Sequence, residues 1–162
     1  MWFFMISSYC LIFLSGIGLF IIGLNHYFYL LIFEIGLIKM DLFISMIFIA
    51  TQTLVMFFFV GTGVSIKEYI QENPSINSSY HHKSIQLKRK LYPPTMAVTI
   101  FFVAMVILDG LYIIGQVQEI WFHISYGLTC YYFIKSMIIQ HYCFKENTQI
   151  ILEMTGLATS KM

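Results

Sequence analysis

Four long apolar runs divide this chain, and each has the length of a helix that crosses a membrane. The runs cover residues 2–24, 42–62, 95–115 and 120–143. A helix needs roughly 20 consecutive apolar residues to span the hydrocarbon core of a bilayer. The pattern therefore predicts an all-α integral membrane protein, built as an antiparallel bundle of four transmembrane helices in a single membrane domain.

Polar residues gather in two segments that we expect to lie outside the bilayer. Residues 63–94 are rich in Lys, Asn and Ser, and they close with Pro93 and Pro94. Proline is common at the start of a helix and disrupts one that precedes it. We therefore predict a cytoplasmic loop over 63–94 that leads into the third span, and a polar tail over 144–162.

The segment 25–41 allows two interpretations. It is mostly apolar, but Glu34, Lys39 and Asp41 interrupt it. Such a segment can lie on the membrane surface as an amphipathic helix, or it can extend the second span into a long, tilted helix. The pattern favours the surface helix and leaves the alternative open.

The distribution of Lys and Arg predicts the orientation of the bundle. Five of these residues fall in the segment 63–94 and two in the tail, whereas the opposite side has only Lys39. Connections rich in Lys and Arg stay on the cytoplasmic side of a membrane. We therefore expect both termini in the cytoplasm, or in the matrix of an organelle, and a bacterial or organellar inner membrane as the host.

The composition supports lipid as the solvent for most of the chain. Hydrophobic residues make up 59% and charged residues only 10%, whereas a soluble domain usually has about 25% charged residues. The net charge of +1 gives no reason to expect nucleic-acid binding. The three cysteines lack CxxC spacing and no nucleophile or phosphate-loop motif is present, so we expect no catalytic activity of the chain's own.

Ionisable side chains converge on the non-cytoplasmic half of the predicted bundle. Asp109 falls in the third span, while His26 and His123 stand at the ends of the first and fourth spans. Glu34 and Asp41 lie in the connection on the same side, and Glu119 flanks the turn there. Charged groups inside a membrane are expensive and usually face other protein groups or a water-filled path. The sequence therefore predicts that any chemistry is located at this end.

Four polar residues within the spans are candidates for helix–helix contacts or for a proton path. Ser45 and Gln52 share one face of the second span, Asp109 belongs to the third and Tyr126 to the fourth. Such residues normally point into a bundle, where they hydrogen-bond a neighbouring helix. Acids within a membrane also serve as proton relays, so both interpretations stay open.

Two cofactor hypotheses use the same end of the bundle. His26 and His123 are predicted at the same depth on different helices, which is the arrangement that holds a b-type haem from both faces. The second hypothesis is a metal centre built from these histidines with Glu34, Asp41 and Asp109. Mixed histidine and carboxylate ligands suit iron, zinc or copper.

Three consecutive basic residues, Lys88, Arg89 and Lys90, precede the third span. Such a cluster next to a span can contact anionic lipid headgroups, with each charge contributing about 1 kcal/mol. The alternative is that these charges only determine the topology.

The sequence as a whole predicts an accessory or structural subunit of a larger membrane complex, with a respiratory or redox complex as the host. The chain has little soluble mass, and its many aromatic and methionine side chains suit packing against other membrane subunits or lipid. Two alternatives stay open. One is a small b-type cytochrome or metal-binding redox protein, and the other is a small transporter or channel that uses the intramembrane acid Asp109.

Overall fold

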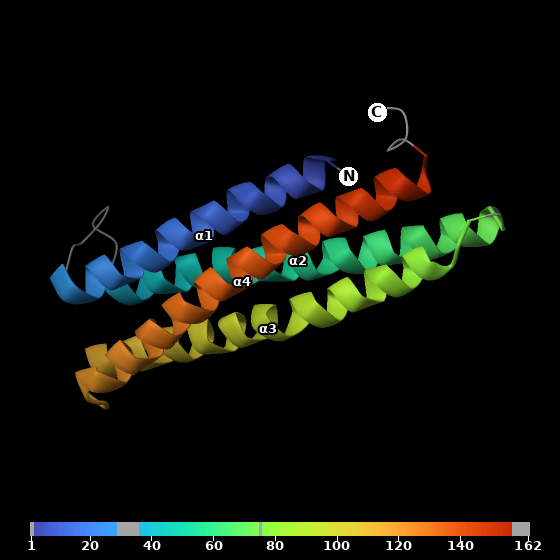
Figure 1. Cartoon of the computed structure of the whole chain (residues 1–162). Coiled ribbons are helices and arrows are strands. Elements are labelled where there is room, and N and C mark those ends of the chain that lie inside the picture. The colour runs from blue at the N-terminus through green and yellow to red at the C-terminus, as the bar shows by residue number, and fades with distance from the viewer. Residues whose placement is uncertain (1, 29–35, 75, 157–162) are drawn as a thin grey trace.

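The computed structural model of the protein describes residues 2–28, 36–74 and 76–156, and the regular elements within these ranges are four α-helices. They are α1 (Trp2–Phe28), α2 (Leu37–Glu72), α3 (Ser79–Ile113) and α4 (Glu119–Met154), as labelled in Figure 1. Glu34 lies outside the described residues, as do the end of the predicted tail and most of the connection between α1 and α2.

The prediction of an all-α membrane protein is confirmed in its main point. Among the described residues, three helices are long and apolar enough to cross a membrane, and they cover Phe3–Phe28, Ile38–Glu72 and Ser79–Ile113. Helix α4 is not one of the three, and Lys135 and Gln140 interrupt its apolar stretch. An α-helix rises about 1.5 Å per residue, so α2 with its 36 residues is longer than the hydrocarbon core is thick.

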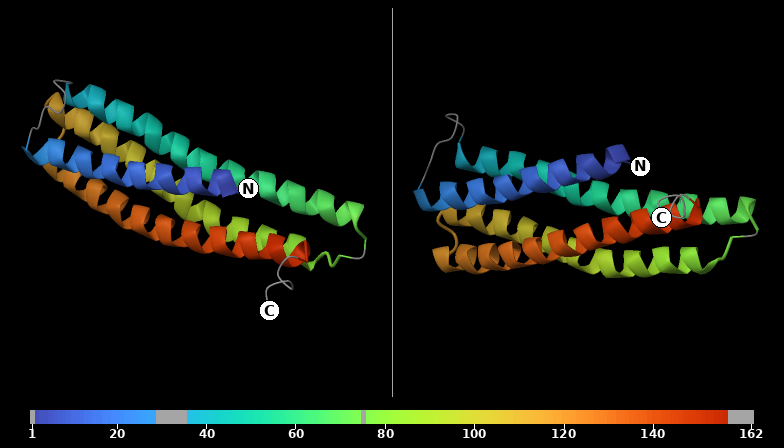
Figure 2. Two further views of the ribbon diagram at one scale, coloured as in Figure 1. Left: turned by 90° about the horizontal axis from the view of Figure 1, so that it is seen from above. Right: turned by 45° about the horizontal axis from the view of Figure 1, so that its top comes forward.

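The helices lie side by side and alternate in direction (Figures 1 and 2). One end of the bundle holds the end of α1, the start of α2 and the turn between α3 and α4, and we call it the His26 end. The other end holds the connection between α2 and α3, the start of α1 and the end of α4, and we call it the loop end. The turn after α3 uses Gly115 at a φ of 75°, a conformation that glycine adopts without a steric penalty.

Most of the segment 63–94 is helical, which differs from the loop that the sequence predicted. Helix α2 continues to Glu72 and α3 begins at Ser79, so only the few residues between them are not helical. Pro93 and Pro94 lie inside α3. A proline within a helix removes one backbone hydrogen bond, and membrane proteins tolerate this where neighbouring helices pack around the site. The charged residues of the segment are good helix formers, and they extend the helices beyond the apolar core.

Apolar side chains fill the interior in two clusters. The cluster nearer the His26 end is built around Phe48, Phe102 and Phe122, all fully buried, and the cluster nearer the loop end around Phe59 and Phe144. The rings of Phe48 and Phe102 stack with their centroids 3.8 Å apart. Large apolar side chains also stay exposed along the outside of all four helices. This surface suits contact with membrane lipid.

Candidate functional site

A cluster of buried ionisable side chains lies at the His26 end, where α1, α2 and α3 each contribute one. Nδ1 of His26 lies 2.6 Å from Oδ1 of Asp109. The Asp41 carboxyl is in turn hydrogen-bonded to the carboxyl of Asp109. All three residues are buried, with 3 to 6% of their surface exposed. We call these three residues the His26 cluster.

The helix geometry explains why these residues meet. Asp41 faces Asp109 across the same antiparallel pair of helices in which Phe48 faces Phe102; Phe48 follows Asp41 by seven residues in α2, and Phe102 precedes Asp109 by seven residues in α3. Seven residues are close to two helical turns, so both pairs fall on the same face. His26 completes the cluster from α1, two residues before that helix ends.

Glu119 connects the cluster with the surface. It begins α4, directly after the turn that follows α3, and its side chain is 51% exposed. One of its carboxylate oxygens lies 3.7 Å from Nε2 of His26. The imidazole ring itself is held in place by Phe122, whose ring stacks on it with centroids 3.5 Å apart. A movement of the Glu119 side chain alone would therefore bring its carboxylate within hydrogen-bond distance of Nε2 of His26.

Three buried acceptor atoms at this end have no hydrogen-bond partner among the described residues. They are Oδ1 of Asn25, Nε2 of His26 and Oδ1 of Asp41. When Asp109 is ionised, His26 donates its Nδ1–H to it, and the Nε2 atom then carries a lone pair. A buried polar group without a hydrogen-bond partner lowers the stability of the fold by about 1 to 3 kcal/mol.

A hydrogen bond between two carboxyl groups requires one proton, because an ionised carboxylate can only accept. Such a bond between Asp41 and Asp109 needs one shared proton. The remaining carboxylate accepts the Nδ1–H of His26, which lies 2.6 Å from Oδ1 of Asp109. Buried charges are tolerated in this paired form and are costly without it.

His123 lies beside the cluster, as the sequence predicted, with its ring centroid 5.9 Å from that of His26. Its Nδ1 hydrogen-bonds the backbone oxygen of Glu119 at 2.9 Å. The rings of Phe122 and Tyr27 pack on both histidines, at centroid distances between 3.5 and 6.3 Å for the contacts among these four rings. A porphyrin would have to displace these aromatic rings, so haem binding at this pair stays a prediction.

The metal-centre hypothesis gains no geometric support. Within the described ranges, no group of three or more His, Cys, Asp or Glu side chains is arranged to hold a metal ion. His26, Asp41 and Asp109 do meet, but they bond to one another rather than converging on an empty point. The fifth predicted ligand, Glu34, lies outside the described residues.

A second polar site crosses the centre of the bundle, and we call it the glutamine layer. Nε2 of Gln140 lies within 2.9 to 3.2 Å of oxygen atoms of Gln52, Thr95 and Ser136. All four residues are buried, and three helices contribute them. Gln52, a predicted candidate, thus makes helix–helix contacts.

The other two candidates within the spans also hydrogen-bond backbone oxygens. Ser45 donates to the backbone oxygen of Asp41 at 2.7 Å, within its own helix. Tyr126 donates to the backbone oxygen of Leu19 at 3.4 Å, between α4 and α1. Its ring occupies the space above Gly23, where an added Cβ would collide with it. These contacts support a role in packing for both residues.

The basic residues that were predicted to contact lipid headgroups belong to α3 and point in different directions. The Lys88 ammonium lies over Gly63 of α2, so close that an added Cβ there would collide with it. The Lys90 ammonium lies 3.9 Å from the centre of the Tyr142 ring of α4, and Arg89 is exposed. Two of the three therefore contact neighbouring helices, and lipid-headgroup binding by the three stays a prediction.

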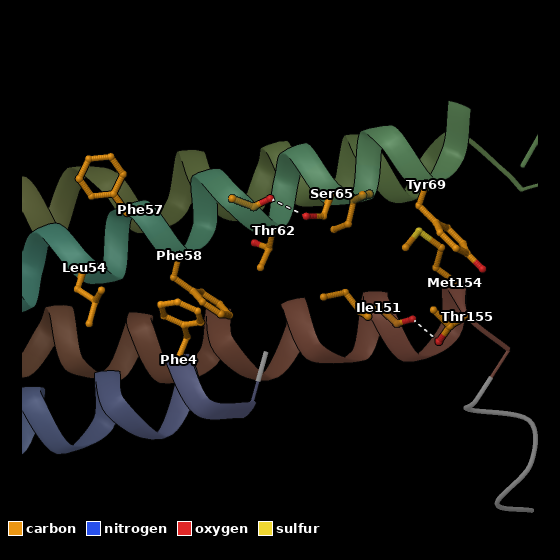
Figure 3. Close-up of a pocket in the computed structure, with 12 residues that line it drawn as sticks. Phe4, Leu54, Phe57, Phe58, Thr62, Ser65, Tyr69, Ile151, Met154 and Thr155 are labelled. Atoms are coloured by element: carbon orange, nitrogen blue, oxygen red, sulfur yellow. Dashed lines mark hydrogen bonds between the residues drawn. The ribbon is translucent and has the colours of Figure 1, made fainter. Parts of the chain in front are cut away.

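An apolar groove of about 630 Å³ lies near the loop end, between α2 and α4 and beside the start of α1 (Figure 3). Phe4, Phe58 and Met154 are among its lining residues. The hydroxyls of Ser65 and Thr155 in its wall donate to backbone oxygens of their own helices. The groove therefore presents hydrocarbon surface and contains none of the ionisable residues of the His26 cluster.

Sequence reasoning did not single out Asn25 or Gln140 as site residues, and it placed Glu119 near this end without assigning it a role in the site. Gln140 carries a usable signal, because an amide within an apolar stretch normally bonds to a neighbouring helix. Glu119 and Asn25 stand at helix ends, where polar residues are ordinary. Their involvement follows from which way each helix is turned, and a single sequence does not contain that information.

No protein-family model, no curated protein and no solved structure matches this chain. We therefore infer the function of the chain from its fold and from the geometry of the His26 cluster.

Proposed function

We propose that this chain is a four-span membrane protein that exchanges protons at the His26 cluster, and that it does so as a subunit of a larger membrane complex. The buried chain of contacts from Asp41 through Asp109 to His26 is the observation that carries the proposal. Ionisable residues within a membrane mark proton relays and ion paths more often than ordinary packing.

The four-span topology is supported by the way α4 packs. It returns along α3 after a short turn, so a membrane crossed by α3 also surrounds most of α4. The single Lys within its predicted span, Lys135, lies 5.9 and 5.8 Å from the ring centres of Tyr131 and Tyr132. A long side chain with such neighbours can carry its charge toward the interface.

The orientation rests on the basic residues. The loop end carries Lys67, Lys83, Arg89 and Lys145, while the His26 end carries only Lys39 among the described residues. By the positive-inside rule, the loop end and both termini face the cytoplasm or matrix. The His26 cluster then lies in the opposite half of the bilayer.

The cluster differs from a packing contact because its protons can be gained and lost. The shared proton of the two carboxyls, the imidazole and the exposed Glu119 form one series of exchangeable sites. A respiratory or redox complex is the proposed host, because such complexes take up and release protons within the membrane. A partner subunit would then supply the remainder of the path.

Infrared spectroscopy of the protein in lipid nanodiscs tests the proposal. The carbonyl stretch of protonated carboxyl groups is followed between about pH 4 and about pH 9. We expect a band that changes with pH in the wild type and is absent from the double variant Asp41→Asn/Asp109→Asn. Glu72→Gln, which removes an exposed carboxyl at the loop end, is the matched control and should retain the band. Identical spectra for the wild type and the double variant would disprove proton exchange at this site.

A further inference from the structure

The His26 cluster has different surroundings on its two sides. Toward its own end it approaches the exposed Glu119 side chain. Toward the bundle centre it meets Met105, Phe48 and Phe102, each with no exposed surface. Ile44 and Ile22 complete this apolar layer, with 5% and 0% of their surface exposed. Protons move along hydrogen-bonded groups or water, and this layer offers neither.

We propose that Glu119 is the residue through which the His26 cluster exchanges protons with water, and that the layer around Phe48 and Phe102 closes the cluster toward the loop end. This inference rests on the proposed function, and it specifies the route and the side of access. The 3.7 Å between Glu119 and Nε2 of His26 carries it, together with the absence of a hydrogen-bond partner for Nε2 among the described residues.

The transfer balances without any further reactant. A protonated Glu119 gives its proton to Nε2 of His26, and the Nδ1 proton passes to Oδ1 of Asp109 across 2.6 Å. The proton held between Asp109 and Asp41 then moves fully to Asp41. The imidazole is left neutral with its proton on Nε2, and the same steps in reverse restore the first state.

Other ionisable groups also face the cluster, and each is an alternative to Glu119 as the group that exchanges protons with His26. Tyr112 of α3 lies 5.1 Å from the His26 ring by centroid distance, and Tyr27 of α1 lies 5.3 Å from it. His123 of α4 is half-buried and its Nδ1 is bonded to the backbone of Glu119. On α2, Lys39 is exposed, two residues before Asp41. Among these groups, only Glu119 combines an exposed side chain with a carboxylate directed at Nε2 of His26.

The test measures how fast the carboxyl band of the cluster responds to a pH jump in nanodiscs. Both ends of the bundle meet the same buffer there, so a second fast route through the loop end would keep the rate unchanged. We expect Glu119→Gln to slow the response by about a hundredfold or more, the scale of a lost acid–base group. Glu72→Gln should respond at the wild-type rate.

Each outcome has a separate meaning. A wild-type rate in Glu119→Gln would overturn this inference and leave the proposed proton exchange intact. A wild-type protein without any pH-dependent band would overturn the proposed function itself. Because Glu119 is exposed in the first turn of α4, its replacement removes about 0.3 to 1 kcal/mol of helix stabilisation and leaves the bundle folded. Circular dichroism of the variant verifies this.

Discussion

The His26 cluster and the glutamine layer lie on either side of the aromatic pair Phe48 and Phe102. In the glutamine layer, Gln140 brings one amide within hydrogen-bond distance of three oxygen atoms, and all partners are neutral. In the His26 cluster the partners are ionisable, and two of its three side chains keep an acceptor atom without a partner among the described residues. Both sites are equally inaccessible, so burial does not distinguish them.

The difference lies in how completely each site is satisfied. Buried polar groups that serve packing normally have their hydrogen bonds filled, because each unfilled one lowers stability. No atom of the glutamine layer is among the buried unpartnered atoms of the described residues. The His26 cluster has two such atoms, and an exposed carboxylate approaches one of them, Nε2 of His26. We infer that the glutamine layer aligns the helices, whereas the cluster retains capacity for exchange.

The largest expected effect on stability comes from removing the histidine of the cluster. His26→Ala leaves a buried carboxylate without its hydrogen-bond donor, which costs about 3 kcal/mol at neutral pH. The loss should grow as pH rises, because the unfolded chain releases its carboxyl protons while the folded variant retains them. Unfolding by SDS in mixed micelles at several pH values measures this. His82→Ala, at an exposed position of α3, is the control, and an equal cost at every pH would refute the pairing.

The next effect comes from the glutamine layer. The Gln140 amide nitrogen has two hydrogens, so Gln140→Ala removes two full hydrogen bonds, each worth about 0.6 kcal/mol inside a membrane, and we expect a loss of about 1 kcal/mol. This loss should not depend on pH, and the infrared titration should match that of the wild type. Gln149→Ala changes an exposed glutamine of the same helix and should be almost silent. A shift of the carboxyl titration in Gln140→Ala would mean that the two sites are coupled across the aromatic pair.

The positions of the helices could be predicted from the sequence, whereas the contacts within these two sites could not. Hydropathy located the helices, because apolar runs long enough to cross a bilayer rarely occur outside membrane-spanning helices. It misjudged residues 63–94, because charges and prolines are as typical of loops as of helix ends that leave the bilayer. The gathering of His26, Asp41 and Asp109 at one end followed from topology alone. Their direct contact did not, since it depends on the rotation of each helix about its axis.

The smallest expected effect on stability is the one that separates the two sites most clearly. Asp109→Asn keeps the shape of the carboxyl group, and its amide oxygen can still accept from Nδ1 of His26. Its amide nitrogen can donate to Asp41, so we expect a change in stability below about 1 kcal/mol. The shared proton is no longer required, however, and the pH-dependent carboxyl band should disappear. A site built for packing would show the opposite result, with a clear loss of stability and no spectral change. Measuring unfolding and the infrared titration on the same Asp109→Asn sample therefore decides whether the His26 cluster is a second glutamine layer or a site of proton exchange.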